Sequence, residues 1–340
     1  MIRVFHVPAH LAYVQTLVGT GFTPVAAPGD CGAMRVADLL AIASWSWFDV
    51  LHLHTVELAT RDELVALAAR CRGERKRLVV TVHDLSPNIE AGYHEHREKL
   101  RVALDAAESV ATLTPTARRA VQQISARPCV VVPHGAAFPL DLLHGQPRSG
   151  GHGVAVYGAL RPNRAFTRLL AAWRQQPPGL PLRVLVRSVS REDERRYAKT
   201  LAELREATEH GVELQILGDF VAPAELLAWL RRSHLLALPY VQITHSGQIE
   251  AARDAGLGVL APDLPTLRDQ LAPLDWPVAW FPPLSPLTDW LFHAAAMPAP
   301  AETAVRAAWR SRHDEHRAII DAHAVMYGAH PKPTNSGNLR

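Results

Sequence analysis

Arginine side chains follow two neighbouring apolar runs in the second half of this chain. Gly158 ends the first run, Arg161 and Arg164 come directly after it, and Arg187 ends the next run. The planar guanidinium group makes paired hydrogen bonds to phosphate oxygens. A single arginine in such a turn is more often a solvated surface residue. Three at the ends of neighbouring strands favour a site for an anionic ligand such as a diphosphate.

A second phosphate-binding feature lies in the segment LPYVQITHSGQIEA, residues 238–251. Ser246 and Gly247 form a small-residue turn before a predicted helix, whose first N–H groups are free to bind phosphate. Glycine lets a ligand approach the backbone closely. Glu250 falls in the first turn, where it offsets the helix dipole by about 0.3–1 kcal/mol. Alternatively, its carboxylate accepts hydrogen bonds from the hydroxyls of a ribose.

Histidines end two apolar runs in the first half. His52 and His54 alternate along one run and therefore share a face of the predicted strand. His83 and Asp84 end the next run. At a strand end, a histidine can bind a sugar hydroxyl or a phosphate, whereas His52, one pleat deeper, is typical of a satisfied core residue. The same four residues also permit a metal site, as in a metal-dependent hydrolase.

Short apolar runs alternate with helical patterns along most of the chain. Continuous apolar runs indicate strands that are covered on both faces, and strand–helix alternation indicates parallel sheets with right-handed crossovers. Strands are predicted at 2–8, 23–27, 49–54, 78–84, 109–114, 129–134, 153–159, 182–188, 213–219, 235–240, 258–262 and 278–282. Helices are predicted at 61–72, 115–126, 164–175, 191–209, 223–232, 246–256 and 301–327.

The α/β pattern pauses once, at HGQPRSGGHG (144–153), whose glycines and polar residues are typical of a linker. We therefore predict two domains, residues 1–148 and 149–300. A helix over 301–328, packing back across the domains, and a disordered tail over 329–340 follow. Two such halves leave a cleft at the carboxyl ends of their strands, where open α/β sheets bind ligands.

The bulk composition excludes several classes of protein. The chain has 340 residues, is 48% hydrophobic and carries a net charge of +3, which indicates a globular protein and gives no support for nucleic-acid binding. Cys31, Cys71 and Cys129 supply neither a disulfide framework nor zinc-ligand spacing, so a cytoplasmic location is expected. No run of about 18 apolar residues predicts a membrane span. Basic residues within 70–77 leave a weak contact with the inner membrane surface as an alternative.

Taken in order, the motifs resemble those of retaining GT-B glycosyltransferases of family four, over residues 3–270. The motifs are DVLHLH (49–54), TVHDLSP (81–87), TLTPTARRAV (112–121), VVPHG (131–135), GALRPNRA (158–165), LPYVQITHSGQIEAARDAG (238–256) and VLAPD (259–263). The resemblance implies an α/β fold of the GT-B type, two Rossmann-like domains whose parallel sheets face a cleft. The first would bind the acceptor and the second a nucleotide sugar.

The resemblance also implies roles for single residues. Arg164 stands at the lysine position that binds the donor diphosphate, and Arg161 takes over from the arginine that Ala159 replaces. Glu250 matches the second glutamate of an E-x7-E motif, which binds ribose. The first glutamate is Gln242 here, a departure that supports a second hypothesis. In this alternative, the chain is a non-catalytic or epimerase-like GT-B protein that binds a nucleotide sugar.

The implied reaction is transfer of a hexosyl group from a nucleoside-diphosphate sugar, UDP-linked, with retention of configuration. The acceptor, a saccharide, a lipid or a small metabolite, is not specified by the sequence. Neither a metal nor another cofactor is expected. The expected catalytic residues are His83, Arg164 and Arg161. The expected donor-binding residues are Gly158, Arg187, Gln242, His245, Ser246, Gly247 and Glu250. The expected acceptor-side residues are His10, His54 and Asp84. A nicotinamide dehydrogenase is excluded, because no G-x-G-x-x-G turn follows a first strand.

Overall fold

The chain divides into two compact units in the computed structural model. The structure describes all residues except 11, 20, 29–33, 88–91, 145–150, 176–179, 188, 220, 273–274, 286 and 330–340. Unit 1 takes most of residues 1–133 together with the chain from Glu315 onward, and unit 2 takes residues 134–314. The domain bounds expected from the composition stay a prediction, and the expected tail lies outside the described residues from 330 onward.

Unit 1 is built on a parallel six-stranded sheet. Its strands are β1 (Ile2–Val7), β2 (Phe22–Pro24), β3 (Val50–Leu53), β4 (Arg77–Val82), β5 (Ser109–Thr112) and β6 (Cys129–Val131). They lie in the order β2-β1-β3-β4-β5-β6. The chain order therefore reverses between β1 and β3. In open α/β sheets, such a reversal marks the place where ligands bind, outside the carboxyl ends of the strands.

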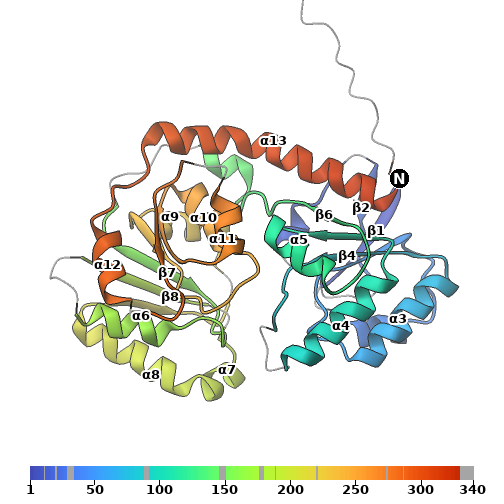
Figure 1. Ribbon diagram of the computed structural model, residues 1–340, viewed down its shortest axis with the longest axis horizontal. Coiled ribbons are helices and arrows are strands. Elements are labelled where there is room, and N and C mark those ends of the chain that lie inside the picture. Colours follow the sequence, from blue (N-terminus) through green and yellow to red (C-terminus); the bar gives the residue numbers. More distant parts are fainter. Residues whose placement is uncertain are drawn as a thin grey trace, which may run out of the picture. The chain divides into compact units, whose positions relative to one another are not determined.

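Helices cover both faces of this sheet, which explains the continuous apolar runs of its strands (Figure 1). On one face pack α2 (Val36–Ala41), α3 (Arg61–Gly73), α4 (Tyr93–Ala106) and α5 (Pro115–Gln122). On the other face pack α1 (Ala12–Gln15) and the second half of α13 (Glu302–Tyr327). Unit 1 thus joins two segments that lie far apart in the sequence.

Unit 2 also has a parallel six-stranded sheet. Its strands are β7 (Val154–Gly158), β8 (Leu182–Val186), β9 (Glu213–Ile216), β10 (Leu235–Ala237), β11 (Gly258–Pro262) and β12 (Val278–Phe281). The order β12-β11-β10-β7-β8-β9 is that of a doubly wound dinucleotide-binding sheet. Here the chain order reverses between β7 and β10, so the loops after these two strands are the expected ligand site.

The helices of unit 2 also form two layers (Figure 1). On one face pack α6 (Phe166–Trp173), α8 (Ala198–Glu206) and α12 (Thr288–Ala295). On the other face pack α9 (Pro223–Leu230), α10 (Gly247–Ala255), α11 (Pro265–Leu271) and the first half of α13, with the 3-10 turn η1 (Leu140–His144). Among the described helices, none combines the length and the apolar character that crossing a membrane requires.

The twelve predicted strands are all present, one helix prediction is wrong, and five of the described helices, α1, α2, α4, α11 and α12, were not predicted. The single helix expected over 191–209 is broken at Tyr197 (φ −106°, ψ 24°) into α7 (Arg191–Arg196) and α8, followed by the 3-10 turn η2 (Ala207–His210). No residue of α7 is buried, whereas Tyr197 packs on the core, so the chain turns inward there. Helix α4 was not predicted, because charged residues and histidines hide its apolar stripe, which includes Leu100 and Leu104.

Candidate functional site

The arginine cluster predicted in unit 2 forms at the point where its strand order reverses. Strand β7 ends at Gly158, whose φ of 133° is a conformation that other residues rarely adopt. The Arg164 guanidinium lies against this glycine, and a Cβ atom at position 158 would collide with Arg164 Nη1. The missing side chain of Gly158 therefore lets Arg164 cross the end of β7.

Arg164 is held in a defined position by groups from three segments. Its Nη1 donates to the Ala159 carbonyl at 2.6 Å, and its Nη2 donates to the Tyr240 hydroxyl at 3.0 Å. Tyr240 donates to Gln248 Oε1 at 2.8 Å, and Gln248 Nε2 donates to the Tyr157 carbonyl. Arg164 Nε is buried and has no hydrogen-bond partner among the described residues. The guanidinium is thus oriented in advance, and each terminal nitrogen carries a second N–H that can donate to a ligand.

The other two arginines lie close enough to influence one another. Arg187 follows β8, its amide donates to the Gly158 carbonyl at 3.3 Å, and its guanidinium lies 5.9 Å from the centre of the Tyr157 ring. Burial lowers the pKa of Arg187, and the positive charges of Arg164 and Arg161 lower it further. Arg161 is exposed. Like charges that gather in this way repel one another, and a bound anion relieves the repulsion.

The turn before α10 has fewer free N–H groups than its sequence indicates. Ser246 caps the helix, since its hydroxyl accepts from the Gln248 amide at 3.2 Å, while its own amide donates to Gln270 Oε1 at 2.7 Å. Within the described chain, the Gly247 amide has no hydrogen-bond partner. A Cβ at Gly247 would lie 3.0 Å from His134 Nε2. Of the two amides expected to bind phosphate, only that of Gly247 is therefore available.

Glu250 is buried among positive groups. Its carboxylate accepts from Arg253 at 2.7 Å, from Arg312 at 2.9 Å and from Gln270 at 3.2 Å. Burial acts to raise the pKa of Glu250, but the charges of Arg312 and Arg253 outweigh it and hold the pKa below its usual value. Glu250 is thus ionised and already bonded to three donors. A ribose hydroxyl would have to add to these contacts.

Arg312 of α13 was not expected from the sequence. It is 1% exposed and bonds both Glu250 and Asp254, the latter at 2.7 Å. Nothing in the sequence separates Arg312 from exposed arginines of the same helix such as Arg306. Only the docking of α13 on α10 makes the difference.

The two remaining donor-side predictions fall on the loop after β10. The Gln242 side chain is exposed, and its backbone carbonyl accepts from Asn163 Nδ2 at 3.3 Å. His245 is half-buried, and its ring lies 5.6 Å from that of His134. These residues therefore flank the turn before α10, but their contacts with a donor stay a prediction.

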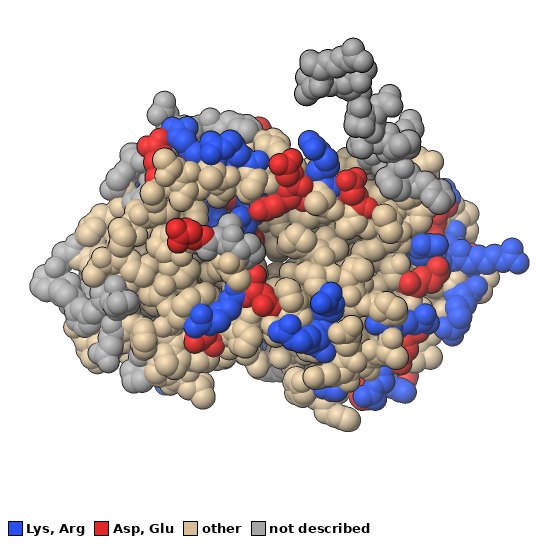
Figure 2. Space-filling view, turned by 45° about the horizontal axis from the view of Figure 1, so that its top comes forward, with Lys and Arg blue, Asp and Glu red and all other residues tan. Residues whose placement is uncertain are grey.

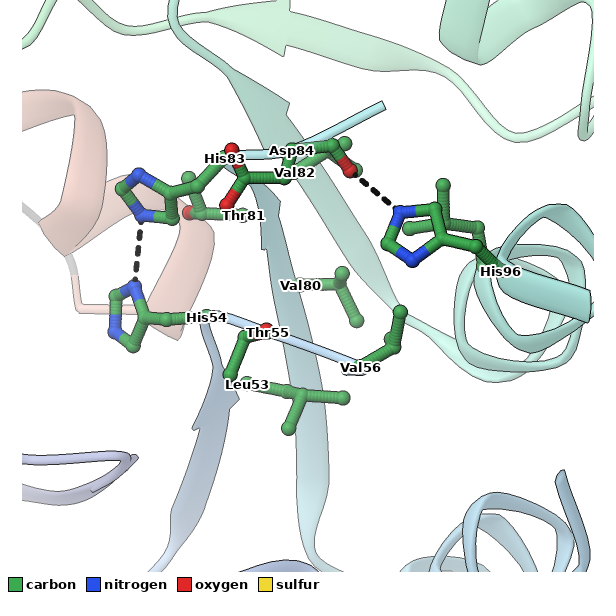
Figure 3. A pocket seen from close by; sticks show the side chains of 11 residues that line it. Leu53, His54, Thr55, Val56, Val80, Thr81, Val82, His83, Asp84 and His96 are labelled. Carbon is green, nitrogen blue, oxygen red and sulfur yellow. Dashed lines mark hydrogen bonds between the residues drawn. The ribbon is translucent and has the colours of Figure 1, made fainter. Parts of the chain in front are cut away.

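Three histidines of unit 1 meet at the reversal between β1 and β3. His6 and His52 are register partners, and His54 lies two residues beyond His52 on the same face. His6 Nδ1 lies 2.9 Å from His54 Nε2. His54 Nδ1 lies 3.2 Å from His83 Nε2 (Figure 3). His54 is 1% exposed, and His83 is the more exposed of the two side chains. His54 therefore lies deeper in unit 1 than His83.

His52 is a fully buried histidine with both ring nitrogens in hydrogen bonds. Its Nδ1 bonds the Tyr327 hydroxyl at 2.7 Å, and its Nε2 bonds the Thr81 hydroxyl at 2.8 Å. Burial lowers the pKa of His6 to about 3 and lowers the pKa values of His52 and His54 well below the usual value. Without a bound ion these imidazoles are therefore neutral at pH 7.

The other expected acceptor-side residues lie at the ends of β1 and β4. His10 is exposed, and Asp84 is half-buried, with its backbone carbonyl bonded to His96 Nε2 at 3.0 Å (Figure 3). A cavity of about 10 Å³ beside Asp84 is lined by His54, His83, Asp84, His96 and mostly apolar residues in and next to β3, β4 and α4. This volume holds about one water molecule, so the cavity is not a sugar pocket.

Comparisons with known proteins establish the fold. No family model matches the sequence, and no curated protein sequence matches it. The UDP-forming α,α-trehalose-phosphate synthase of Burkholderia vietnamiensis is 13% identical, with a TM-score of 0.60 over 87% of this chain and 77% of that one. HepE of Anabaena, in complex with UDP-glucose, is 16% identical, with a TM-score of 0.67 over 96% of this chain and 100% of that one.

Sucrose-phosphate synthase from Thermosynechococcus elongatus is likewise 16% identical, with a TM-score of 0.60 over 86% of this chain and 75% of that one. At these identities the likeness concerns the fold alone. The chain has the GT-B fold, an α/β architecture of two Rossmann-like domains with parallel sheets, as its motifs predicted.

Proposed function

We propose that this GT-B chain transfers a hexosyl group from a nucleoside-diphosphate sugar, most simply a UDP-sugar, to an acceptor. One observation carries the proposal: Arg161, Arg164 and Arg187 gather where the strand order of unit 2 reverses. Neither Arg161 nor Arg164 forms an ion pair with a described carboxylate. In support, structures of similar fold are named as UDP-forming or hold UDP-glucose.

The arginines would act on the leaving group. As the bond between the sugar and the diphosphate breaks, negative charge grows on the phosphate oxygens. Preorganised cations and N–H groups stabilise such charge, often as the largest contribution to catalysis. Arg164, fixed by Ala159 and Tyr240, and the Gly247 amide would supply this stabilisation without a metal ion. The acceptor proton would pass to the departing phosphate, with retention of configuration.

The acceptor side rests on the resemblance alone. His83 would orient the transferred sugar, and His10, His54 and Asp84 would lie toward the acceptor. Because His54 is buried behind His83, we expect it to act through His83 and not by direct contact. The acceptor class, saccharide, lipid or small metabolite, is open to a screen.

The first prediction tests the diphosphate site. Replacing Arg164 with Ala should weaken UDP binding by about 10- to 100-fold, because a hydrogen bond to a charged group contributes about 1.5–3 kcal/mol. Isothermal titration with UDP, GDP, TDP, ADP and CDP measures both the loss and the base preference. Arg174→Ala is the matched control, since Arg174 is exposed in unit 2 and pairs only with Glu206 among the described acids. Equal UDP affinity in both variants would remove Arg164 from the site.

A second function is favoured by Gln242, which brings an exposed amide where related enzymes carry a carboxylate. In this alternative the chain binds a nucleotide sugar without transferring it. Release of UDP from UDP-sugars, measured with a panel of acceptors, separates the two. A transferase releases UDP only as fast as the glycosylated product forms, whereas a binding protein releases none.

The hydrolase alternative is disfavoured by the geometry. A catalytic metal keeps an open position for water. His52 and His54 are buried, and each uses both ring nitrogens in hydrogen bonds to neighbouring side chains. Such a closed arrangement gives a water nucleophile no access.

A further inference from the structure

We propose that His6, His52 and His54 form a closed binding site for one transition-metal ion of the Zn²⁺ class. Each of the three side chains offers a ring nitrogen, and these nitrogens lie within 4.8 Å of one another. The side chains are 2%, 0% and 1% exposed, respectively. The site belongs to unit 1 and is separate from the arginine cluster of unit 2.

The sheet itself brings the three residues together. His6 of β1 and His52 of β3 are direct register partners in parallel strands, and His54 follows on the same face. They stand at the carboxyl ends of the two strands between which the chain order reverses. Open α/β sheets place ligands at this position. The three metal-binding histidines thus come from rigid strand ends rather than from mobile loops.

The nitrogen atoms are already close to a coordinating arrangement. A tetrahedral site with zinc–imidazole bonds of about 2.0–2.1 Å holds its ligand nitrogens about 3.3–3.5 Å apart. His6 Nδ1 and His54 Nε2 are 2.9 Å apart without an ion. Small side-chain rotations therefore suffice to admit one between them. The other nitrogen of His6, Nε2, is buried and has no hydrogen-bond partner among the described residues.

Outer groups orient the ligands as they do in known metal sites. Histidine ligands usually bond a second group through the nitrogen that does not bind the metal. Thr81 bonds His52 Nε2 at 2.8 Å, and His83 bonds His54 Nδ1 at 3.2 Å. This leaves His52 Nδ1 and His54 Nε2 to bind the ion. The Tyr327 hydroxyl lies 2.7 Å from His52 Nδ1. Tyr327 can therefore supply an oxygen as the fourth ligand.

The surroundings make this a structural site rather than a hydrolytic one. The rings of Tyr13, His323 and Tyr327 surround the three histidines, with ring centres 5.6–6.4 Å from individual members. A closed site with four protein ligands is typical of structural zinc. The ion would link β1, β3 and the last turn of α13, and would stabilise unit 1 by mass action. This departs from the expectation that the chain holds no metal.

The experiment measures metal in the full chain, produced without a histidine tag. The protein is purified from zinc-supplemented cells, and a second portion is unfolded with a chelator and refolded with Zn²⁺ or Co²⁺, because the ligands are buried. After gel filtration, we expect about one ion per chain by mass spectrometry and the intense visible bands of tetrahedral Co²⁺. His6→Gln should lose the ion. His96→Gln should retain it, since His96 is equally buried in unit 1 but outside the cluster.

Three outcomes would overturn the proposal. One is a metal content of the wild-type protein below about 0.1 ion per chain in both preparations. The histidines would then form a hydrogen-bonded network without an ion. Another is an ion that a chelator removes at once from the folded protein, which indicates surface binding. The third is equal retention by wild type and His6→Gln. Circular dichroism checks the folding of each variant. If His6→Gln does not fold, the metal content and the cobalt spectrum of the wild-type protein test the proposal.

Discussion

At the scale of single residues, the donor site depends on an absent side chain. Gly158 leaves the space that the Arg164 guanidinium fills, and Tyr240 and Ala159 then fix its direction. Glycine here is needed both for the backbone angle and for this contact. Replacing Gly158 should therefore weaken diphosphate binding, although the substitution removes no charge.

Gly158→Ala tests this dependence. The new methyl group would displace Arg164, so we expect at least a tenfold loss of UDP affinity and a lower melting temperature. Gly211→Ala separates strain from collision, because Gly211 also has a positive φ (84°), but a Cβ added there would meet no atom within 4 Å. That control should lose about 1–3 kcal/mol of stability with unchanged UDP affinity. Equal losses of affinity in both variants would show that backbone strain, not the contact with Arg164, matters.

At the scale of elements, α13 and α10 are joined by a buried ion cluster. Arg312 of α13 bonds Asp254 and Glu250 of α10, and Asp254 Oδ2 also accepts from the Ala137 amide at 2.7 Å. Burial raises the pKa of Asp254 although Arg312 acts to lower it. Arg312 therefore pairs with both buried carboxylates, and Glu250 has Arg253 as a second cationic partner.

Replacing Arg312 with Met should cost about 3–5 kcal/mol of unfolding free energy, because it leaves the buried Asp254 carboxylate without its cationic partner. Urea unfolding followed by circular dichroism measures the change. Arg306→Met is the control on the same helix. Arg306 is exposed and pairs with Glu302, so its loss should cost no more than about 1 kcal/mol. A similar cost in both variants would contradict a special role for Arg312.

At the scale of the whole molecule, unit 1 depends on the far end of the chain. Ile319, Ile320, Ala324 and Met326 of α13 are buried on one face of its sheet, against a cluster that includes Val4. The domain 1–148 expected from composition lacks these residues. Its sheet would therefore expose an apolar face to water.

A fragment of residues 1–148 should accordingly bind a hydrophobic dye and aggregate, whereas a peptide of residues 315–329 added to it should restore a cooperative melt. The same peptide with Ile319→Asp and Ile320→Asp is the control and should have no effect. Thermal unfolding followed by circular dichroism distinguishes these results. A fragment that melts cooperatively by itself would show that unit 1 does not need α13.

The surface carries charged side chains of both signs. Figure 2 shows basic and acidic side chains interspersed over the face in view, in line with the net charge of +3. Within the basic segment 70–77, Arg70 donates to the carbonyls of Leu40 and Ile42, and Lys76 donates to that of Phe48. These cations bind the protein itself, which weakens the case for a membrane-surface contact. The cytoplasmic location stays a prediction.

Local patterns in the chain indicated the strands and the arginine cluster, but they missed several helices. Apolar runs mark the central strands, because a strand buried on both faces must be apolar throughout, whereas the edge strand β9 alternates exposed Glu213 and Gln215 with half-buried apolar residues. Arg161, Arg164 and Arg187 could be placed together because parallel strands end at one edge of a sheet. The same reasoning set His54 beside His83.

The tertiary structure alone decided which distant groups share a site. His6 joins His54 across 48 residues, Arg312 joins Glu250 across 62, and Tyr327 joins His52 across 275. These partners depend on strand order and on where α13 docks, and neither is encoded in a local period or turn. A buried arginine and an exposed one look alike in sequence. Their energies differ only after packing removes water from one of them.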